Sequence, residues 1–144
     1  MRELEICRKN GDYATYYVYD NFGQLRYVLP PGVSGTHKES EDIMQQLAYW
    51  YRYDDRGNCI LSKTPGVSPS VFKYDSANRL VAENNANLGD KWRMYFYDYA
   101  GRQVVMADCV LNNPMQIDEI CAHPITLEFD ITNDTDSAIP GYGF

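Results

Sequence analysis

Three groups of residues in this chain could do chemistry: carboxylates, cysteines with histidines, and aromatic rings. The 144-residue sequence holds 20 acidic residues, four cysteines, two histidines and 13 tyrosines. Positioned carboxylates act as general acids and bases, converging Cys and His side chains bind metals, and exposed aromatic rings stack on flat ligands such as sugars. The spacing of these residues decides which of the three chemistries is open to the chain.

Four aspartates recur in one phrase, Tyr-Asp-x-x-Gly or a close variant, which ends an aromatic-rich run. The phrase stands at Tyr19-Asp20, Tyr53-Asp54, Tyr74-Asp75 and Tyr97-Asp98. Aromatic surroundings could raise the pKa of such an aspartate and make it a general acid. However, no second carboxylate or histidine recurs in phase with them, and His37 and His123 fall in expected loops. The spacing therefore predicts structural aspartates and a protein that is not an enzyme.

The cysteines and the acidic C-terminal stretch are the candidate metal ligands. Four cysteines are widely and irregularly spaced, with no Cys-x-x-Cys pair: Cys7, Cys59, Cys109 and Cys121. This spacing favours small buried side chains, or at most one disulfide, over a metal site. Residues 130–136 offer oxygen atoms that could bind Ca²⁺, but they lack the central glycine and terminal glutamate of an EF-hand loop. We expect a solvated acidic turn there, with no metal and no cofactor.

The repeated phrase has the chemistry of a β-hairpin turn. Aspartate at the first turn position accepts a hydrogen bond from the backbone two residues on, and Gly or Asn supplies the positive φ of a type I turn with a G1 bulge. The twelve structural positions of the repeat are Tyr19, Asp20, Gly23, Tyr53, Asp54, Gly57, Tyr74, Asp75, Asn78, Tyr97, Asp98 and Gly101. The sequence thus predicts four hairpins.

Alternating runs on both sides of each phrase predict the strands. Outgoing strands are expected at 15–19, 49–53, 70–74 and 93–97, and return strands at 25–29, 59–61, 80–82 and 103–106. One strand face carries eight aromatic residues and is expected to be the core: Tyr17, Tyr19, Tyr51, Tyr53, Phe72, Tyr74, Tyr95 and Tyr97. The opposite face is mixed and expected to be partly solvated. Trp50 and Trp92 fall outside the aromatic register, so they are the candidates for exposed ligand contacts.

Other segments complete the expected fold, a mainly β antiparallel meander of hairpins with one short helix. Residues 4–8 predict a strand that Asn10-Gly11 joins to the first hairpin, and Ser40 caps a helix expected at about 41–48. Residues 1–107 hold all 13 basic and 13 acidic residues, whereas 108–144 hold seven acids and no Lys or Arg. We therefore divide the chain into a repeat region, 1–107, and an acidic segment, 108–144. The acidic segment contains one expected strand at 125–132 and reads as an incomplete β unit.

Composition also restricts the partners. The sequence has no basic patch to offset phosphate charge, which argues against nucleic acid. Its apolar runs are too short to span a bilayer, so we expect no membrane insertion, and the N-terminal residues lack the apolar core of a signal peptide.

The four phased copies between residues 13 and 107 resemble the Rhs/YD-repeat family, which includes toxin-complex shell proteins and the teneurins. The helix between the first two copies further resembles the large Rhs-like surface proteins of gut Bacteroidetes. The resemblance implies hairpins that wind into a hollow shell around a cargo, at the cell surface or secreted. The chain has only four copies and lacks the family's Asp-Pro-x-Gly autocleavage element, so only the structural positions of the repeat carry over.

Two functional hypotheses follow. The first is a non-enzymatic structural segment of a YD-repeat shell or surface polypeptide, whose partners are other segments of the same polypeptide or further copies that associate through sheet edges. The alternative is a carbohydrate- or protein-binding module that uses exposed aromatic residues.

Overall fold

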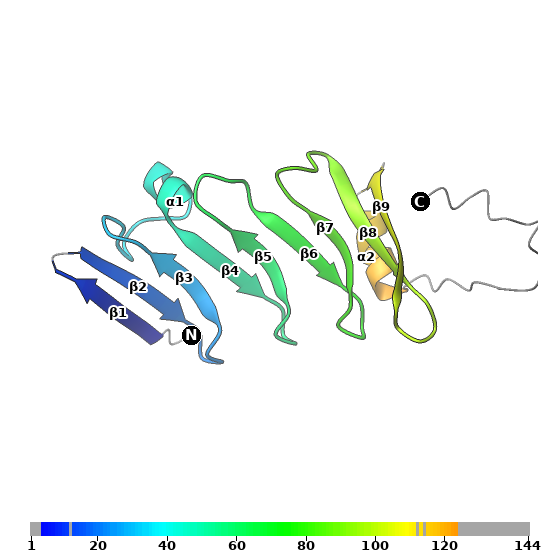
Figure 1. Cartoon of the computed structure of the whole chain (residues 1–144), viewed down its shortest axis with the longest axis horizontal. Coiled ribbons are helices and arrows are strands. Elements are labelled where there is room, and N and C mark those ends of the chain that lie inside the picture. Colours follow the sequence, from blue (N-terminus) through cyan, green and yellow to red (C-terminus); the bar gives the residue numbers. More distant parts are fainter. Residues whose placement is uncertain (1–3, 12, 112, 114, 124–144) are drawn as a thin grey trace, which may run out of the picture.

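The computed structural model describes residues 4–11, 13–111, 113 and 115–123, which form one antiparallel sheet with two helices (Figure 1). The nine strands lie in the sheet in sequence order, each beside its neighbour in the chain. They are β1 Leu4–Asn10, β2 Tyr13–Tyr19, β3 Leu25–Leu29, β4 Tyr49–Tyr53, β5 Cys59–Lys63, β6 Ser70–Tyr74, β7 Leu80–Asn84, β8 Lys91–Tyr97 and β9 Gln103–Val110. The helices are α1 Asp42–Leu47 and α2 Met115–Ala122. The prediction of a mainly β antiparallel meander is confirmed.

The repeated phrase forms the turn of each of the four hairpins β2–β3, β4–β5, β6–β7 and β8–β9. In every hairpin the strand register shifts at the motif tyrosine, as a bulge requires. Asn78 is the one described non-glycine residue with a positive φ, 61°, and the motif glycines Gly23, Gly57 and Gly101 take φ values between 76° and 84°. The expected left-handed corner is therefore present in all four turns.

Neighbouring hairpins join along shorter ladders than the hairpins have internally. The junction of β5 and β6, for example, pairs only Leu61 with Val71 and Ser62 with Ser70. The ladder inside the preceding hairpin runs from Trp50 opposite Lys63 to Tyr53 opposite Cys59. The hairpin is thus the repeating unit, and contacts other than backbone pairing must help to hold one unit to the next.

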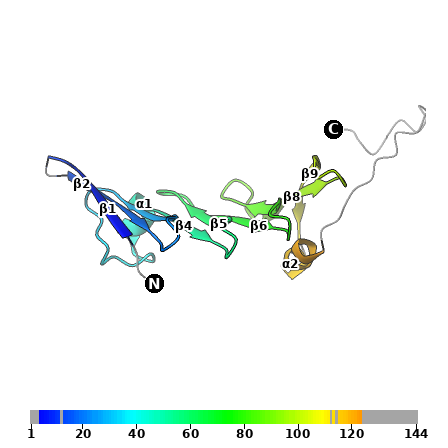
Figure 2. The same ribbon diagram turned by 90° about the horizontal axis from the view of Figure 1, so that it is seen from below.

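The hydrophobic core lies on the face of the sheet opposite to the one expected. Register and alternation place Val18, Trp50, Ala82 and Met94 on one face, and all four are buried. We name it the helix face, because α1 and α2 both pack against it. Figure 2 shows the sheet as a single layer with α2 set to one side.

The opposite face, which we name the tyrosine face, carries the eight aromatic residues that were expected to form the core, from Tyr17 on β2 to Tyr97 on β8. All eight are half-buried and none is fully buried. The prediction that this face forms the core was wrong. In a single-layer sheet a face is buried only where a helix or second sheet covers it, and the helices lie on the other side.

Trp50 is therefore a core residue, contrary to the prediction that both tryptophans make exposed contacts. Trp50 is only 4% exposed and packs with Met44 of α1. Trp92 is half-buried and packs in the cluster of Met94 and Ile117 beneath α2. Both lie outside the register of the tyrosines, as the sequence indicated. Strand alternation therefore places them on the helix face.

The helix expected at about 41–48 is confirmed as α1, which buries Met44 against the sheet. The prediction that Ser40 caps it was wrong, because Glu41 is the N-cap residue and no side chain bonds to the cap. Lys63 secures the C-terminal end of α1: the ammonium donates to the carbonyl oxygens of Gln45 at 2.8 Å and Thr64 at 2.7 Å. It also lies 5.1 Å from the centre of the Trp50 ring. A cation at the C-terminal end of a helix complements its dipole, which explains a lysine in this nearly solvent-free position.

The second helix, α2, was not predicted. It contacts β6 and β7 and inserts Ile117, which is 2% exposed, against Ala82 and Met94. The Asn113-Pro114 dipeptide followed by apolar residues at 117, 120 and 121 is a helix-start signal that could have revealed it. The strand expected at 125–132 lies outside the described residues. No helix in the described ranges is long and apolar enough to cross a membrane.

Candidate functional site

The motif aspartates are built into the turns as hydrogen-bond acceptors. Oδ1 of Asp75 accepts from the backbone N–H groups of Ala77 and Arg79, both at 2.9 Å. Asp20 and Asp54 make the same pair of bonds to the residues two and four positions on. Each aspartate thus satisfies backbone donors that its own tight turn would otherwise leave unpaired.

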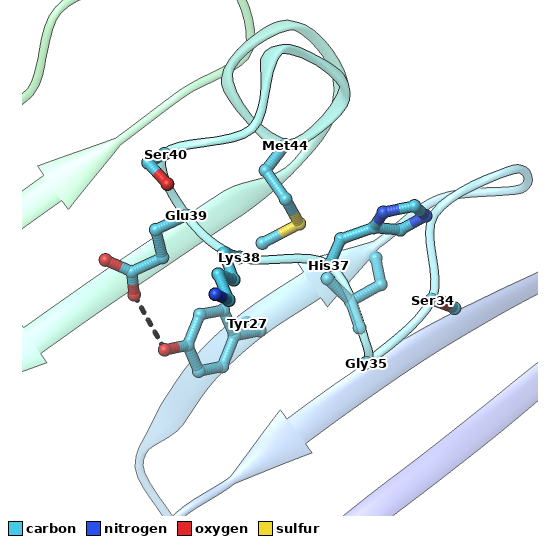
Figure 3. Close-up of a pocket in the computed structure, with 9 residues that line it drawn as sticks. Tyr27, Ser34, Gly35, His37, Lys38, Glu39, Ser40 and Met44 are labelled. Atoms are coloured by element: carbon cyan, nitrogen blue, oxygen red, sulfur yellow. Dashed lines mark hydrogen bonds between the residues drawn. The ribbon is translucent and has the colours of Figure 1, made fainter.

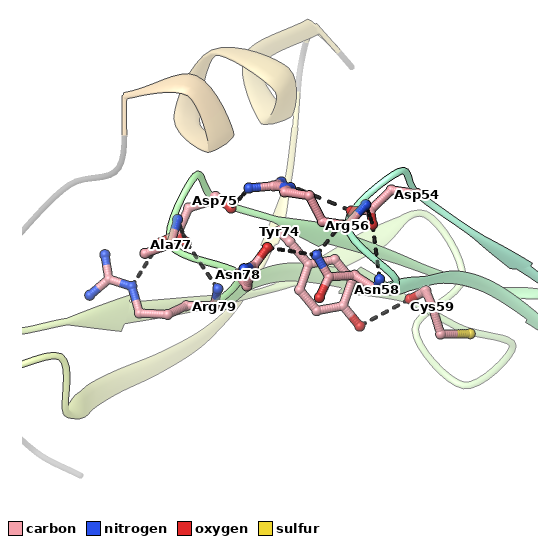
Figure 4. Close-up of polar contacts among 9 residues, drawn as sticks. All are labelled: Asp54, Arg56, Asn58, Cys59, Tyr74, Asp75, Ala77, Asn78 and Arg79. Carbon is pink, nitrogen blue, oxygen red and sulfur yellow. Dashed lines mark hydrogen bonds and ion pairs between the residues drawn. The ribbon is translucent and has the colours of Figure 1, made fainter. Parts of the chain in front are cut away.

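The second carboxylate oxygen is engaged by the side chain four positions after the aspartate in three of the turns. Asn58 donates to Asp54 at 3.0 Å, Arg79 to Asp75 at 2.8 Å and Arg102 to Asp98 at 2.9 Å. The first two pairs appear in Figure 4. The role of this position was missed in the sequence, because its residue type varies among Gln24, Asn58, Arg79 and Arg102.

In two of the turns, these bonds favour the ionised form of the aspartate. The backbone hydrogen bond from Arg102, helped by its guanidinium, holds the pKa of Asp98 below its ordinary value. For Asp54, burial alone would raise the pKa, but the hydrogen bonds from Asn58 and Arg56 outweigh burial and lower it. A carboxylate tuned in this direction is an acceptor near neutral pH and has no proton to donate as a general acid.

The motif tyrosines connect one hairpin to the next through their hydroxyl groups. The Tyr53 hydroxyl donates to the backbone carbonyl of Leu25 at 2.8 Å, and that of Tyr97 donates to Leu80 at 2.5 Å. The Tyr74 hydroxyl lies 3.0 Å from its acceptor, the carbonyl of Cys59 (Figure 4). We call Tyr53, Tyr74 and Tyr97 the inter-hairpin tyrosines. Each acceptor stands five residues after the aspartate of the preceding phrase.

Turn residues add further bonds between adjacent units. Arg56 of the second turn donates to the carbonyl of Asp75 in the third at 3.0 Å. Asn58 donates to the side chain of Asn78 at 3.0 Å (Figure 4). Arg79 of the third turn lies 4.6 Å from the centre of the Tyr97 ring in the fourth hairpin, within cation–π range. The repeat positions therefore meet in a continuous network along one end of the hairpins.

A pocket of about 550 Å³ lies between the loop before α1 and strand β3 (Figure 3). Several of its polar side chains are already paired. The Tyr27 hydroxyl donates to Glu39 at 2.7 Å, and Arg52 pairs with the same carboxylate. His37 bonds to Glu41 at 2.9 Å, and that bond lowers the pKa of Glu41.

This arrangement holds the loop on the sheet but does not assemble a nucleophilic site. The Ser34 hydroxyl, which lines the same pocket, bonds to Thr36 at 2.7 Å rather than to His37. A histidine–carboxylate pair activates a hydroxyl only when the hydroxyl is within hydrogen-bond reach of the ring. His123, the other histidine, is exposed after α2.

Candidate metal ligands do not converge in the described part of the chain. No group of three or more His, Cys, Asp and Glu side chains gathers there. The four cysteines are free thiols, of which Cys7 is exposed and the other three are half-buried. Burial raises the pKa of Cys59 and of Cys121, so both thiols favour their neutral, unreactive form. The acidic stretch at 130–136 lies outside the described residues.

Neither the protein-family models nor the curated proteins match this chain significantly.

Proposed function

We propose that this chain is a non-enzymatic structural segment of a YD-repeat polypeptide, in which successive hairpins build a wall. The observation that carries the proposal is the bond from each inter-hairpin tyrosine to a carbonyl at a fixed position of the preceding hairpin. These bonds give the recurrent tyrosine of the phrase a role in joining one hairpin to the next. A repeat whose side chains are used to join units needs no substrate to explain its sequence pattern.

The edges of the sheet support the same proposal. Within the described residues β1 and β9 each have one neighbouring strand, so each leaves backbone groups along its outer side. Such edges pair readily with another strand. The partners that fit them are further hairpins of the same large polypeptide or a second copy of this chain. By the resemblance, such a wall would stand at the cell surface or be secreted as part of a shell.

The proposal is tested by adding a unit. A copy of residues 68–90 inserted after Asp90 preserves the spacing between Tyr74 and Tyr97 and should form one more hairpin. We expect the longer chain to unfold in one transition with a larger denaturant m-value, because m grows with the surface exposed on unfolding. The matched control carries Tyr74→Ala and Asp75→Ala in the inserted copy only. The inserted hairpin of the control is expected to stay unfolded. Two separate unfolding transitions, or an unaltered insert that also stays unfolded, would refute a stacking repeat.

The coding sequence on both sides of the chain gives an independent check. Further Tyr-Asp-x-x-Gly phrases in the same reading frame are expected, and their absence would leave the hairpins without the long array that the proposal requires.

A further inference from the structure

The tyrosine face is an aromatic surface that neither the helices nor the stacking of hairpins covers. Both helices pack on the opposite face, and the tyrosine face keeps its rings half-exposed. Register adds more apolar side chains to the same side. Tyr49 lies opposite Val28, and Met106 lies opposite Tyr95, and both Tyr49 and Met106 are exposed. Exposed apolar side chains gathered on one face of a sheet indicate a contact site.

The inter-hairpin bonds fix how three of these rings lie. The hydroxyl of Tyr74 reaches a backbone oxygen of the neighbouring strand, so its ring must lie across the sheet rather than project from it (Figure 4). The corresponding hydrogen bonds of Tyr53 and Tyr97 give their rings the same orientation. Each ring therefore turns part of its flat face to the outside, and its rotamer freedom is already restricted before a ligand arrives.

The rings recur with a regular period across the strands. Tyr53, Tyr74 and Tyr97 end β4, β6 and β8, so consecutive rings stand two strands apart, roughly 10 Å at ordinary strand spacing. An extended β-1,4-linked glycan repeats every two sugars, a length close to twice the spacing between strands. The C–H face of every second sugar would then meet an aromatic ring, which is the contact that π-faces favour.

The charge on this face selects an uncharged ligand. Between β4 and β6 the register places only neutral residues there: Tyr49, Tyr51, Tyr53, Ser62, Ser70, Phe72 and Tyr74. Towards β9 two acids, Glu83 and Asp108, face two cations, Arg93 and Lys91. Arg93 bonds to Asp108 at 2.8 Å and lies 4.0 Å from Glu83, so the charges on these strands compensate one another. A nucleic acid or an acidic peptide would find no surplus of positive charge on these strands, whereas sugar hydroxyls could bond to the serines and to the ion pairs.

A second copy packed face to face would suit the surface less well. It would bury the guanidinium of Arg8, which stacks on Tyr17 at 5.5 Å, together with the Arg93 cluster. Burying such groups costs free energy that their pairing does not fully return. A glycan, in contrast, leaves them in water at the rim.

From these observations we propose that the tyrosine face between β4 and β8 binds an uncharged, extended β-linked polysaccharide that runs across the strands. The proposal goes beyond the structural function and does not depend on it. It also differs from the sugar-binding site expected from the sequence. It uses the motif tyrosines and the rings of Tyr51 and Phe72 beside them on the same face, in place of the buried Trp50 and the half-buried Trp92.

The test is calorimetric titration of the full chain with cellohexaose, alongside sedimentation with microcrystalline cellulose. We expect binding that Tyr51→Ala and Phe72→Ala each weaken by roughly tenfold, the change that the loss of one good contact produces. Tyr99→Ala is the matched control, because Tyr99 is 76% exposed but lies in the turn after β8. Its binding should equal that of the unchanged chain.

Amide NMR shifts of the unchanged chain give a readout that does not depend on variants that fold. Cellohexaose should shift the amides of β4 to β8 and spare α1 and α2. The proposal is overturned if cellohexaose and cellulose do not bind, if binding is insensitive to Tyr51→Ala and Phe72→Ala, or if the shifts lie elsewhere. It is also overturned if concentrating the protein alone produces the same shifts together with a dimer, since a second copy would then occupy the face.

Discussion

The hydroxyl of Tyr74 lies 3.0 Å from the backbone carbonyl oxygen of Cys59, on the first residue of the preceding return strand. Burial raises the pKa of Tyr74, so the phenol stays protonated and remains a donor well above neutral pH. The corresponding bonds of Tyr53 and Tyr97 reach the first residue of their own preceding return strands. The repeated tyrosine thus adds a side-chain bond to the short backbone ladders that join neighbouring hairpins.

Removing one hydroxyl should weaken the junction of two hairpins. We expect Tyr74→Phe to lower the free energy of unfolding by about 1 kcal/mol, because the carbonyl of Cys59 loses its donor while the ring remains. Tyr99→Phe, at an exposed turn position, is the control and should change nothing measurable. Urea denaturation followed by circular dichroism measures both, and equal stability of the two variants would contradict a role for the hydroxyl.

The third turn tests the need for a left-handed corner. Asn78 has a φ of 61° and also accepts a bond from Asn58. Asn78→Ala should destabilise the protein by about 1 to 2 kcal/mol relative to Asn78→Gly, since only the alanine suffers the steric penalty of this region. Both variants lose the bond from Asn58, so their difference in thermal midpoint isolates the backbone. A thermal midpoint that is lower for Asn78→Gly than for Asn78→Ala would contradict this prediction.

Acid should destabilise the turns through Asp98. The folded state holds the pKa of Asp98 below its ordinary value, first through the backbone bond from Arg102. A carboxyl with a lowered folded pKa stabilises the protein above its unfolded pKa and loses that contribution as the pH falls through the folded value. We expect stability to fall between about pH 5 and pH 2, and to fall less in Asp98→Asn.

The comparison of the two chains over that pH range decides the point. Asp98→Asn keeps an oxygen that can accept from the Arg102 amide but cannot titrate. If both proteins lose stability in parallel, other carboxyl groups such as Asp54 and Asp108, whose pKa values are also lowered, account for the whole effect.

Trp50 should behave as a core residue. Trp50→Ala is expected to cost about 3 to 5 kcal/mol, in the range of large buried aromatic side chains, because it removes the ring between Met44 and Lys63. The single-tryptophan variant Trp92→Phe should show emission from Trp50 that iodide quenches poorly. Strong quenching in the folded protein would mean that Trp50 faces solvent.

The open strands should promote self-association. We expect the mean mass measured by light scattering to increase with protein concentration. The increase should be smaller for the double variant Ile6→Lys/Val110→Lys, because charges on edge strands oppose pairing. Ile6 and Val110 are exposed on β1 and β9. Val67→Lys, at an exposed loop position, is the control. A strict monomer over a wide concentration range would refute edge pairing.

Local rules of the sequence were sufficient to predict the hairpins. Asp75 and Asn78 identify a turn because an aspartate acceptor and a left-handed corner are requirements of a few consecutive residues. The alternating runs predicted the strands, and the apolar residues Ile43, Met44 and Leu47 predicted α1, although its N-cap is Glu41 rather than Ser40. The missed helix α2 had a local signal as well, in Asn113-Pro114 and Ile117.

The candidate site was less predictable, because its contacts join residues that are distant in the chain. No sequence pattern predicts that the hydroxyl of Tyr97 donates to the carbonyl of Leu80, or that Arg56 bonds to the carbonyl of Asp75. Those contacts depend on the register between hairpins, which short ladders and side chains set together.

The sequence by itself thus determined the repeated turn, the strands and their order, because each follows from interactions within a few residues. Only the tertiary structure decided which face is the core. Both faces carry apolar side chains, so strand alternation separated Tyr51 from Trp50 without saying which would be covered. The answer came from α1 and α2, which pack through Met44 and Ile117 on the Trp50 side and leave the tyrosine face open.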